Sequence, residues 1–507
     1  MNAALATLPI LVTLGLLAAK VRALYAALAA LGTAGGLTAV VFHTPLAELG
    51  EAQLHMLPTL VELAGILFGG ILLSELMSRT GAQARLGDRL GGASGPQSRA
   101  VLLVVFGVTP FAESLTGFGI GVVVAIPLLR RLGLAPAKAA VVGLLGLVTV
   151  PWGSLAPGSL VSAELGGVDF QELGVVSALL SAPVFLVCGA AALAVAFGIR
   201  RAASAAGELL LATGTLWLTV WAVNRFIGVP LAGVLGGLAV IAVLLLVSRL
   251  QERTNSPAAA PGEPVRRALA PYAFLVLGLL AGRAALTAAS IEEGWWTVIA
   301  GPAGWLLLTT ALTPRLLGVA DEILPDAARS ALSRWWQVTL TTAIFLILGT
   351  LLTVTGMSRE MAEACAALGP AYLLLAPWIG AAGGFLAGSN TGANAMFAAS
   401  QGAAAHALGY PALQLVGIQN VSAALASAGS VARVVLAAEL ATSTPGPDGS
   451  AAQAARQPKR EPAPGDTATA VLEEPRTAPD TGHILRTVLA THAVVFLLLG
   501  AIALLWR

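Results

Sequence analysis

Runs of predominantly apolar residues, each about as long as a membrane-spanning helix, follow one another along almost the whole chain. A helix needs about 20 such residues to cross the hydrocarbon core of a bilayer. Only 11% of the residues are charged, whereas soluble domains average about 25%. We therefore expect an all-α polytopic membrane protein with about 12–14 membrane segments. The predicted spans outside two special blocks are 3–19, 24–42, 56–77, 174–199, 208–223, 229–248, 268–289, 295–313, 334–356 and 486–506.

A polar stretch at 110–121, PFAESLTGFGIG, separates two strongly apolar runs, 101–108 and 122–129. An ionised carboxylate such as that of Glu113 costs about 2.5–3.5 kcal/mol at the centre of a bilayer. Non-helical backbone is tolerated at that depth only where protein or a water-filled cavity satisfies it. We therefore expect 100–131 to be a re-entrant helical hairpin with this stretch at its tip. Its candidate residues are Glu113 for proton or ion coupling, and Ser114, Thr116 and Gly117 for substrate binding.

The polar stretch has a counterpart later in the chain, and two further short motifs recur at the same offset. Ser114, Thr116 and Gly117 recur as Ser389, Thr391 and Gly392, Pro136-Ala137 recurs as Pro411-Ala412, and Ala163-Glu164-Leu165 recurs as Ala438-Glu439-Leu440. One offset held without a gap predicts an internal duplication, with blocks at 100–165 and 371–444. We expect the second hairpin at 371–406. Its candidate substrate-binding residues are Ser389, Asn390, Thr391 and Asn394.

Each block contains a second polar interruption, inside the apolar crossing that follows its hairpin. The first lies at 151–157, where two prolines and a glycine stop a continuous helix. The second lies at 426–430 and consists of small residues. A broken helix exposes backbone N–H groups at its positive end, which suits an anionic substrate. We add Ser154 and Ser430 at the breaks as candidates, and Arg433 as a bidentate partner for a carboxylate.

Basic residues predict the orientation, because they concentrate in cytoplasmic loops. Lys20 and Arg22 place the first loop in the cytoplasm and the N-terminus outside. Arg130 and Arg131 bring the end of the first hairpin back to the cytoplasm, whereas the second block enters from outside. Duplicated blocks of opposite orientation are the inverted-repeat plan of secondary transporters. The predicted parts are a first half, 1–249; a cytoplasmic linker, 250–266; a second half, 267–444; a disordered cytoplasmic linker, 445–485; and a C-terminal transmembrane helix, 486–507.

Three stretches, FAESLTGFGIGVVVAIPLL, LGLAPAKAA and LAGSNTGANAMFAASQGAAAHALG, resemble the L-lactate permease family. That family carries a motif like E-G-x-x-G-F-G-x-P in its first half and one like G-S-D-T-S-x-N-A-L-F in its second. The resemblance implies proton-coupled import of lactate or glycolate. The Ser389-Asn390-Thr391 run also resembles the tip motif of divalent-anion/sodium symporters, distant relatives in the ion-transporter superfamily. Those relatives have paired hairpins and an elevator-type transport domain.

These observations favour proton-driven symport of a small monocarboxylate, such as L-lactate, D-lactate or glycolate, across the plasma membrane. The alternative is a sodium-coupled symporter of carboxylates or other organic anions, which Asn390 favours because the lactate permeases usually have an acid there. An anion channel is a third reading, but the polar residues cluster at the tips instead of forming a continuous lining. The expected partners are the carboxylate, the coupling proton or sodium ion, and the lipid bilayer, with a homodimer left open.

Other classes of protein find little support in the sequence. We find no His-Glu cluster and no Ser/Lys dyad with clear spacing, so we do not expect an enzyme, a metal site or a cofactor. The phosphate-binding motif G-x-x-x-x-G-K-[ST] is absent, which argues against a nucleotide-driven pump. The net charge of +2 gives no reason to expect a nucleic-acid partner.

Overall fold

The computed structural model describes residues 2–82, 85, 96–117, 119–251, 263–291, 295–444 and 479–506. Within these ranges all regular secondary structure is helical, and ten helices are long and apolar enough to cross a membrane. Three shorter apolar helices cover Asn2–Ala18, Pro136–Leu145 and Ala371–Ala387. The predicted all-α polytopic architecture is thus confirmed. Residues 252–262 of the first predicted linker and residues 445–478 of the second lie outside the described residues.

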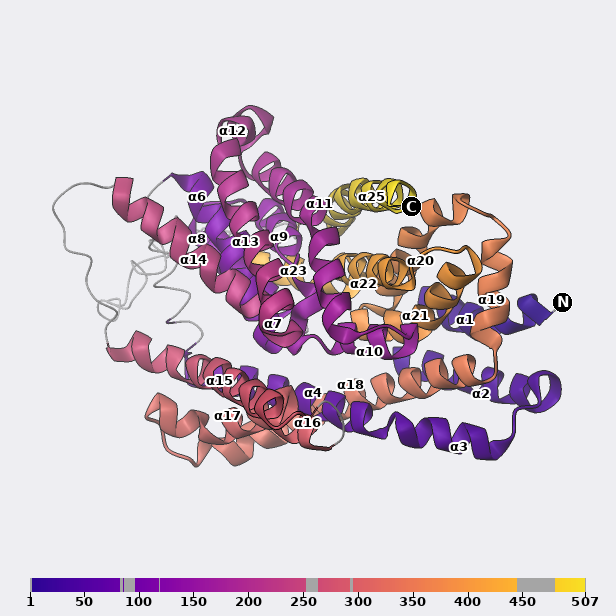
Figure 1. Cartoon of the computed structure of the whole chain (residues 1–507). Helices are drawn as coiled ribbons and strands as arrows, with labels where there is room; N and C mark the ends of the chain where they lie inside the picture. The colour runs from indigo at the N-terminus through magenta and orange to yellow at the C-terminus, as the bar shows by residue number, and fades with distance from the viewer. Residues whose placement is uncertain are drawn as a thin grey trace, which may run out of the picture.

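The helices form a lower layer and a larger upper group in the view of Figure 1. The lower layer contains α2 (Ala23–Leu37) with its π-helical end η1 (Thr38–Phe42), α3 (Leu46–His55), α4 (Leu57–Arg79), α15 (Glu263–Ala288), α16 (Trp295–Ala300), α17 (Pro302–Leu317) and α18 (Ile323–Val354). Two helices, α1 (Asn2–Ala18) and α19 (Met357–Ala366), lie at the right-hand end.

The upper group combines segments from both predicted halves with the C-terminal helix. Its first part contains α6 (Gln97–Leu102), η2 (Leu103–Val108), α7 (Thr109–Thr116), α8 (Ile120–Arg131), α9 (Pro136–Leu145), η3 (Val150–Leu155), α10 (Pro157–Gly166), α11 (Phe170–Phe197), α12 (Ile199–Ser204), α13 (Ala206–Phe226), η4 (Val229–Leu231) and α14 (Ala232–Gln251). Its second part contains α20 (Ala371–Ala387), α21 (Asn390–Ala407), α22 (Ala412–Ala428), α23 (Val431–Ser443) and α25 (Thr481–Leu505).

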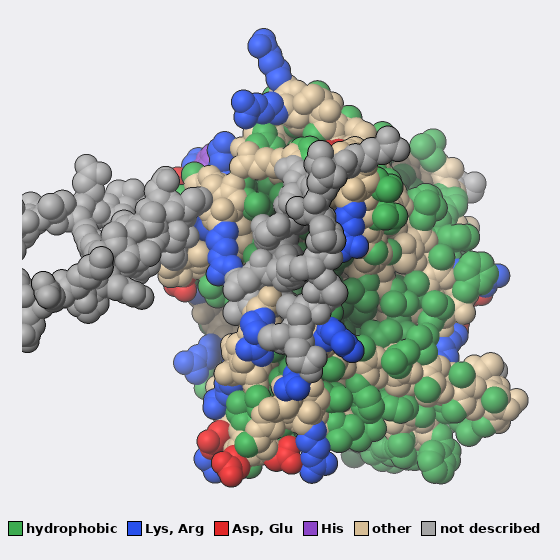
Figure 2. Space-filling model, turned by 90° about the vertical axis from the view of Figure 1, so that its left-hand side faces the viewer, with side chains coloured by type: hydrophobic (Ala, Val, Ile, Leu, Met, Phe, Trp, Pro, Cys, Tyr) green, Lys and Arg blue, Asp and Glu red, His purple; other side chains and the backbone are tan. Residues whose placement is uncertain are grey.

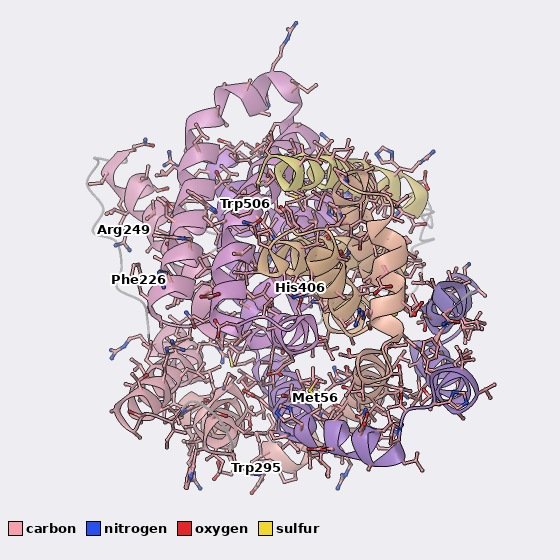
Figure 3. The ribbon with its side chains drawn as sticks, turned by 45° about the vertical axis from the view of Figure 1, so that its right-hand side comes forward. Met56, Phe226, Arg249, Trp295, His406 and Trp506 are labelled. Carbon is pink, nitrogen blue, oxygen red and sulfur yellow. The ribbon has the colours of Figure 1, made fainter. Side chains whose placement is uncertain are left out.

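The surface of the molecule has the character expected of a protein in a bilayer. Figure 2 shows a broad hydrophobic area along one side, and basic side chains gathered on the end that faces the viewer. Large apolar side chains such as Leu497 and Phe226 are 61% and 73% exposed, and Figure 3 shows Phe226 at the periphery. Trp295, 52% exposed, lies at the outer edge of the lower layer (Figure 3). Such exposure is favourable where lipid tails replace water.

Two pairs of helices fold back on themselves through tight turns rich in glycine. The first arm runs through α6, η2 and α7, and the chain reverses at Gly117 and Gly119, whose φ angles are 70° and 82°. The returning helix, α8, packs against α7 and η2. The second pair, α20 and α21, is joined at Gly388, with φ 62°, and its arms also pack together. Only glycine adopts these left-handed conformations without strain.

Both predicted interruptions of the later crossings are present as gaps in helical structure. In the first, η3 ends with two residues in left-handed backbone, Ser154 and Leu155, and Ala156 follows in the same conformation; their φ angles are 52°, 64° and 72°. Residues other than glycine in this region cost about 1–3 kcal/mol each and are found most often at functional sites. In the second, α22 ends at Ala428 and α23 begins at Val431.

Some boundaries differ from the predictions for identifiable reasons. The predicted span 295–313 is divided into α16 and α17 at Gly301-Pro302, because proline is favoured at the start of a helix and cannot continue one. The C-terminal helix begins at Thr481, before the predicted 486, because Asp480 caps it by accepting from the N–H of Gly482 at 2.8 Å.

The two matching motifs of the predicted duplication occupy different places in their hairpins. Ser114 and Thr116 lie in the last turns of α7, whereas Ser389 precedes the first turn of α21 as its N-cap. A constant offset in sequence therefore does not make these residues equivalent in the structure.

Candidate functional site

Glu113 lies near the end of α7 and is buried. Its Oε1 accepts from the N–H of Gly119 and its Oε2 from the N–H of Gly121, both at 3.1 Å. The first N–H groups of a helix have no partner within the helix, and an acid at that end also complements the helix dipole. Glu113 thus caps the start of α8 from the opposite arm of the hairpin. Glu113 therefore has a structural role at the tip of the first hairpin.

Arg433, on α23, comes from the other predicted half and reaches the same tip. Its Nη2 lies 4.0 Å from Oε1 of Glu113, and its side chain is only 12% exposed. Nη1 donates to Oγ of Ser427 at 3.4 Å. The guanidinium lies beside Gly119: a Cβ placed there would be in ordinary contact with Nε of Arg433, at 3.7 Å. The structure thus brings together two candidates that are far apart in the sequence.

Ser154 and Ser430, the candidates at the two breaks, are both buried. In the part of the chain that the structure describes, neither hydroxyl has a hydrogen-bond partner. Each lies against the turn of its own half: a Cβ on Gly117 would lie 2.7 Å from Cβ of Ser154, and one on Gly388 would lie 3.4 Å from Oγ of Ser430. A buried hydroxyl without a partner is costly, so two such groups beside the hairpin tips require an explanation.

The start of α23 adds backbone hydrogen-bond donors beside Ser430. Ser430 is the N-cap residue of α23, but its side chain makes no capping hydrogen bond. The first N–H groups of this 13-residue helix therefore receive no bond from the cap, and the positive end of the helix dipole lies beside Arg433. We call Glu113, Ser154, Ser430 and Arg433 the tip cluster. Its donors suit the carboxylate of a small molecule.

Asn390 and Asn394 belong instead to a network of buried amides. Nδ2 of Asn390 and Nδ2 of Asn394 both donate to Oδ1 of Asn420, each at 2.9 Å. Nδ2 of Asn394 also donates to the carbonyl oxygen of Gly158, at the start of α10, at 3.0 Å. Asn420 in turn donates to the hydroxyls of Ser159 and Ser177, at 2.9 and 3.1 Å. These bonds join α21 and α22 to α10 and α11.

The prediction from sequence missed Asn420, Ser159 and Ser177. A signal was available for Asn420, because it and Gln419 form an amide pair in the middle of an apolar segment. Gln419 and Gln401 extend the network: Nε2 of Gln419 lies 3.4 Å from Oδ1 of Asn394, and Tyr372 donates to Gln401 at 2.8 Å. Ser159 and Ser177 carried no comparable signal.

The other candidates are Ser114, Thr116, Ser389 and Thr391. Ser114 donates to Oγ1 of Thr149 at 3.4 Å, and Thr116 donates to the carbonyl of Ala112 at 2.7 Å. Ser389 accepts from the N–H of Gly392 at 3.3 Å and so caps α21. Thr391, in the first turn of α21, is partly exposed. Among the residues that the structure describes, no group of three or more His, Cys, Asp or Glu side chains could hold a metal ion.

Comparison with known proteins identifies the family of the chain. The chain matches the L-lactate permease family over residues 2–294 and 284–446. It is 24% identical to the L-lactate permease of Halalkalibacterium halodurans over 482 residues, which cover 86% of this chain and 90% of that protein. It is also 24% identical to the L-lactate permeases of Streptococcus iniae, over 61% of this chain and 70% of that protein, and of Escherichia coli K12, over 70% and 74%. With the family matched over most of its length, this multi-pass helical chain belongs to the L-lactate permease family.

Proposed function

We propose that the protein is a secondary transporter that carries a small monocarboxylate, such as lactate or glycolate, across the plasma membrane together with a proton. Membership of the L-lactate permease family and the names of its relatives support this function. The observation that carries the proposal is the approach of Arg433 to Glu113 at 4.0 Å. Arg433, a cation that can bind the substrate carboxylate, and Glu113, an acid that can bind the proton, are thus neighbours in a buried site.

The geometry suggests how proton and substrate binding are coupled. Ionised Glu113 attracts the guanidinium of Arg433, and the carboxylate of a substrate competes for the same guanidinium. Protonation of Glu113 removes that competitor, so Arg433 becomes available for the substrate. By linkage, the bound anion raises the affinity of the site for the proton by the same factor.

The two hydroxyls without partners are suited to the rest of the substrate. A carboxylate held by Arg433 and the start of α23 would lie beside Ser430. The remaining hydroxyl, that of Ser154, is available for a second polar group, such as the 2-hydroxyl of lactate or glycolate. A site built to bond a substrate hydroxyl rejects an analogue that lacks it, because its own polar group is then left unpaired.

The proposed topology includes a first hairpin that does not cross the membrane. Nε2 of Gln97, at the foot of the first arm, donates to the carbonyl of Leu132, just after the second arm, at 2.7 Å. The two ends of the hairpin are therefore adjacent. The 12 residues of α8 extend about 18 Å at about 1.5 Å per residue, and a bilayer core is about 30 Å thick. Both observations support a re-entrant hairpin.

The charge distribution supports the proposed orientation. Arg99 lies in α6, at the start of the hairpin, Arg130 lies in the last turn of α8, and Arg249, labelled in Figure 3, lies in the last turn of α14. Basic side chains gather on one end of the molecule (Figure 2). Since cytoplasmic segments carry such an excess, we assign this end to the cytoplasm and the N-terminus to the outside. The division into two inverted halves, each with a hairpin and a broken helix, remains part of the proposal.

Uptake of radiolabelled lactate into proteoliposomes tests this function. An imposed pH gradient should drive accumulation, and replacing sodium by choline at fixed pH should leave it unchanged. Loss of uptake in choline would favour the sodium-coupled alternative, and flux that never saturates with lactate would favour a channel. Competition of unlabelled lactate, glycolate and propionate with the uptake of radiolabelled lactate measures the substrate specificity. Propionate, which lacks the 2-hydroxyl, should compete weakly with the wild type and comparatively better with Ser154→Ala.

A further inference from the structure

His492 is a buried ionisable residue that the proposed function does not use. It lies on α25, which belongs to neither predicted block, and its side chain has no solvent exposure. In the described part of the chain, neither Nδ1 nor Nε2 has a hydrogen-bond partner. The other four histidines (His43, His55, His406 and His483) are not buried. A neutral imidazole always presents one donor and one acceptor, so leaving both unpaired inside the protein is unfavourable.

His492 lies directly against the second break. A Cβ placed on Gly429 would be 3.3 Å from Nδ1 of His492. Gly429 follows the last residue of α22, and Ser430, whose hydroxyl also lacks a partner in the described structure, follows Gly429. Two buried polar side chains without partners thus flank one gap between helices. The ring of Phe496, 6.3 Å from that of His492 between centroids, covers another side of the imidazole.

The break presents two helix ends of opposite polarity. The C-terminal end of α22 carries a partial negative charge, and the N-terminal end of α23 a partial positive charge. In transporters built from broken helices, N-terminal ends face anionic substrate groups and C-terminal ends face the coupling cation. A histidine beside the end of α22 lies where the partial negative charge of that helix end favours a protonated ring, whereas its complete burial, without partners in the described structure, disfavours the charge. A carboxylate at the start of α23 would complete the arrangement.

The charged side chains around His492 link protonation of its ring to binding of a carboxylate at the start of α23. Helix α25 packs against α9, α11, α20, α22 and α23. The titratable side chains on these helices, and on α25 itself, are Lys138, Glu172, Cys188, Tyr372, Arg433, Glu439, His483 and Arg486. Of these, Arg433 lies closest in sequence to the break, in the first turn of α23. A positive charge on His492 would be repelled by that of Arg433, and an anion bound at the start of α23 would offset this repulsion.

We infer that His492 is a second proton-binding group of the transporter, and that it takes up its proton when a carboxylate occupies the start of α23. This inference rests on the proposed function. It differs from the role given to Glu113 in the interaction that links proton and anion: Glu113 competes with the substrate for Arg433, whereas His492 lies beside the end of α22 and does not compete for that guanidinium. No sequence motif points to His492, since a lone histidine in an apolar helix has no fixed spacing to a partner.

Nuclear magnetic resonance of the purified protein with ¹⁵N-labelled histidine tests the inference directly. At about pH 7, near the usual range of histidine titration, saturating lactate should move one ring signal from the neutral toward the doubly protonated position. That signal should be missing in His492→Gln and retained in His483→Gln, an exposed control on the same helix. If His492→Gln fails to fold, a protein with the other four histidines replaced by Gln leaves His492 as the only signal.

The outcomes separate this inference from the proposed function. If lactate binds and the His492 ring stays neutral, the inference is wrong and the proposed function stands. If lactate and glycolate do not bind to the wild type at all, the proposed function itself fails. In proteoliposomes, His492→Gln should also reduce the stimulation of uptake by a pH gradient at least tenfold while retaining lactate exchange. Unchanged stimulation in this variant would equally overturn the inference.

Discussion

Nη2 of Arg433 lies 4.0 Å from Oε1 of Glu113, although one residue belongs to α23 and the other to α7. The pair is buried, and each partner has only a few other bonds: Glu113 to two backbone N–H groups, and Arg433 to Ser427. Charged side chains inside a bilayer are costly, and those found there usually have a function. The contact joins the two predicted halves at the point where a substrate could intervene.

Glu113→Gln should abolish uphill uptake driven by a pH gradient and retain exchange of lactate across the membrane. The amide has the shape of the protonated acid but can neither release nor take up a proton. It also replaces one acceptor by a donor opposite a glycine N–H, so stability should fall by about 1–3 kcal/mol. Counterflow and gradient-driven uptake are measured on the same proteoliposomes.

The matched control is Glu439→Gln, which removes an exposed acid from α23. It should leave both activities unchanged. If Glu113→Gln still accumulated lactate under a pH gradient, Glu113 would not be the coupling group and would only cap α8.

Arg433→Gln should raise the apparent KM for lactate more than it lowers the maximal rate. Loss of a hydrogen bond to a charged group costs about 1.5–3 kcal/mol, which corresponds to about 10- to 150-fold in affinity. Arg433→Lys keeps the charge but not the planar fork, so its KM should fall between those of the wild type and Arg433→Gln. Equal KM values in all three proteins would move the carboxylate site elsewhere.

Cysteines introduced at Gln97 and Arg131 should react with a membrane-impermeant maleimide from the same side of the membrane. The reason is that the two feet of the first hairpin are adjacent, as the bond between the side chain of Gln97 and the carbonyl of Leu132 in the wild type shows. The background protein lacks Cys188 and Cys365. A cysteine at Glu360 labels the opposite side, because Glu360 shortly precedes the second block, which is predicted to enter the membrane from outside. Labelling of positions 97 and 131 from different sides would exclude a re-entrant hairpin.

Asn394→Ala should lower stability by about 1–3 kcal/mol, because it leaves the Gly158 carbonyl and Oδ1 of Asn420 short of a buried donor. Thermal unfolding in detergent measures the loss. Gln414→Ala, on the neighbouring helix α22, is the control, since the side-chain oxygen of Gln414 has no partner in the described structure. If the two variants unfold at the same temperature, the amide network adds little to stability.

The parts of the site that sequence could predict were local ones. An acid in an apolar segment, glycines at a turn and prolines within a crossing act through their own stretch of chain, and Glu113 and the break at Ser154 followed from them. The nearness of Arg433 to Glu113 was harder to predict, because it depends on how α23 packs against α8. The amide network around Asn420 was missed because its partners come from four helices.

The matching Ser-x-Thr-Gly motifs show where sequence similarity misleads. The first chain reversal is set by Gly117, the last residue of the motif, and by Gly119, which follows it, whereas the second is set by Gly388, which precedes its motif. Ser114 therefore packs inside the bundle against Gly233, where a Cβ would lie 2.1 Å from its Oγ, while Ser389 caps a helix. The position of the turn decides which hydroxyl is available, and the offset between motifs does not contain that information.

The bonds from Asn394 to Gly158 and from Asn420 to Ser159 have a consequence for alternating access. Any motion that separated α10 from α21 and α22 would leave several buried amides and hydroxyls without partners at once. Sliding the upper group as one rigid body over α4 and α18 would disturb none of these bonds. The binding site would then be carried across the membrane with its two hairpin tips in fixed relation, and the Glu113–Arg433 separation would be the same in the inward-open and outward-open states.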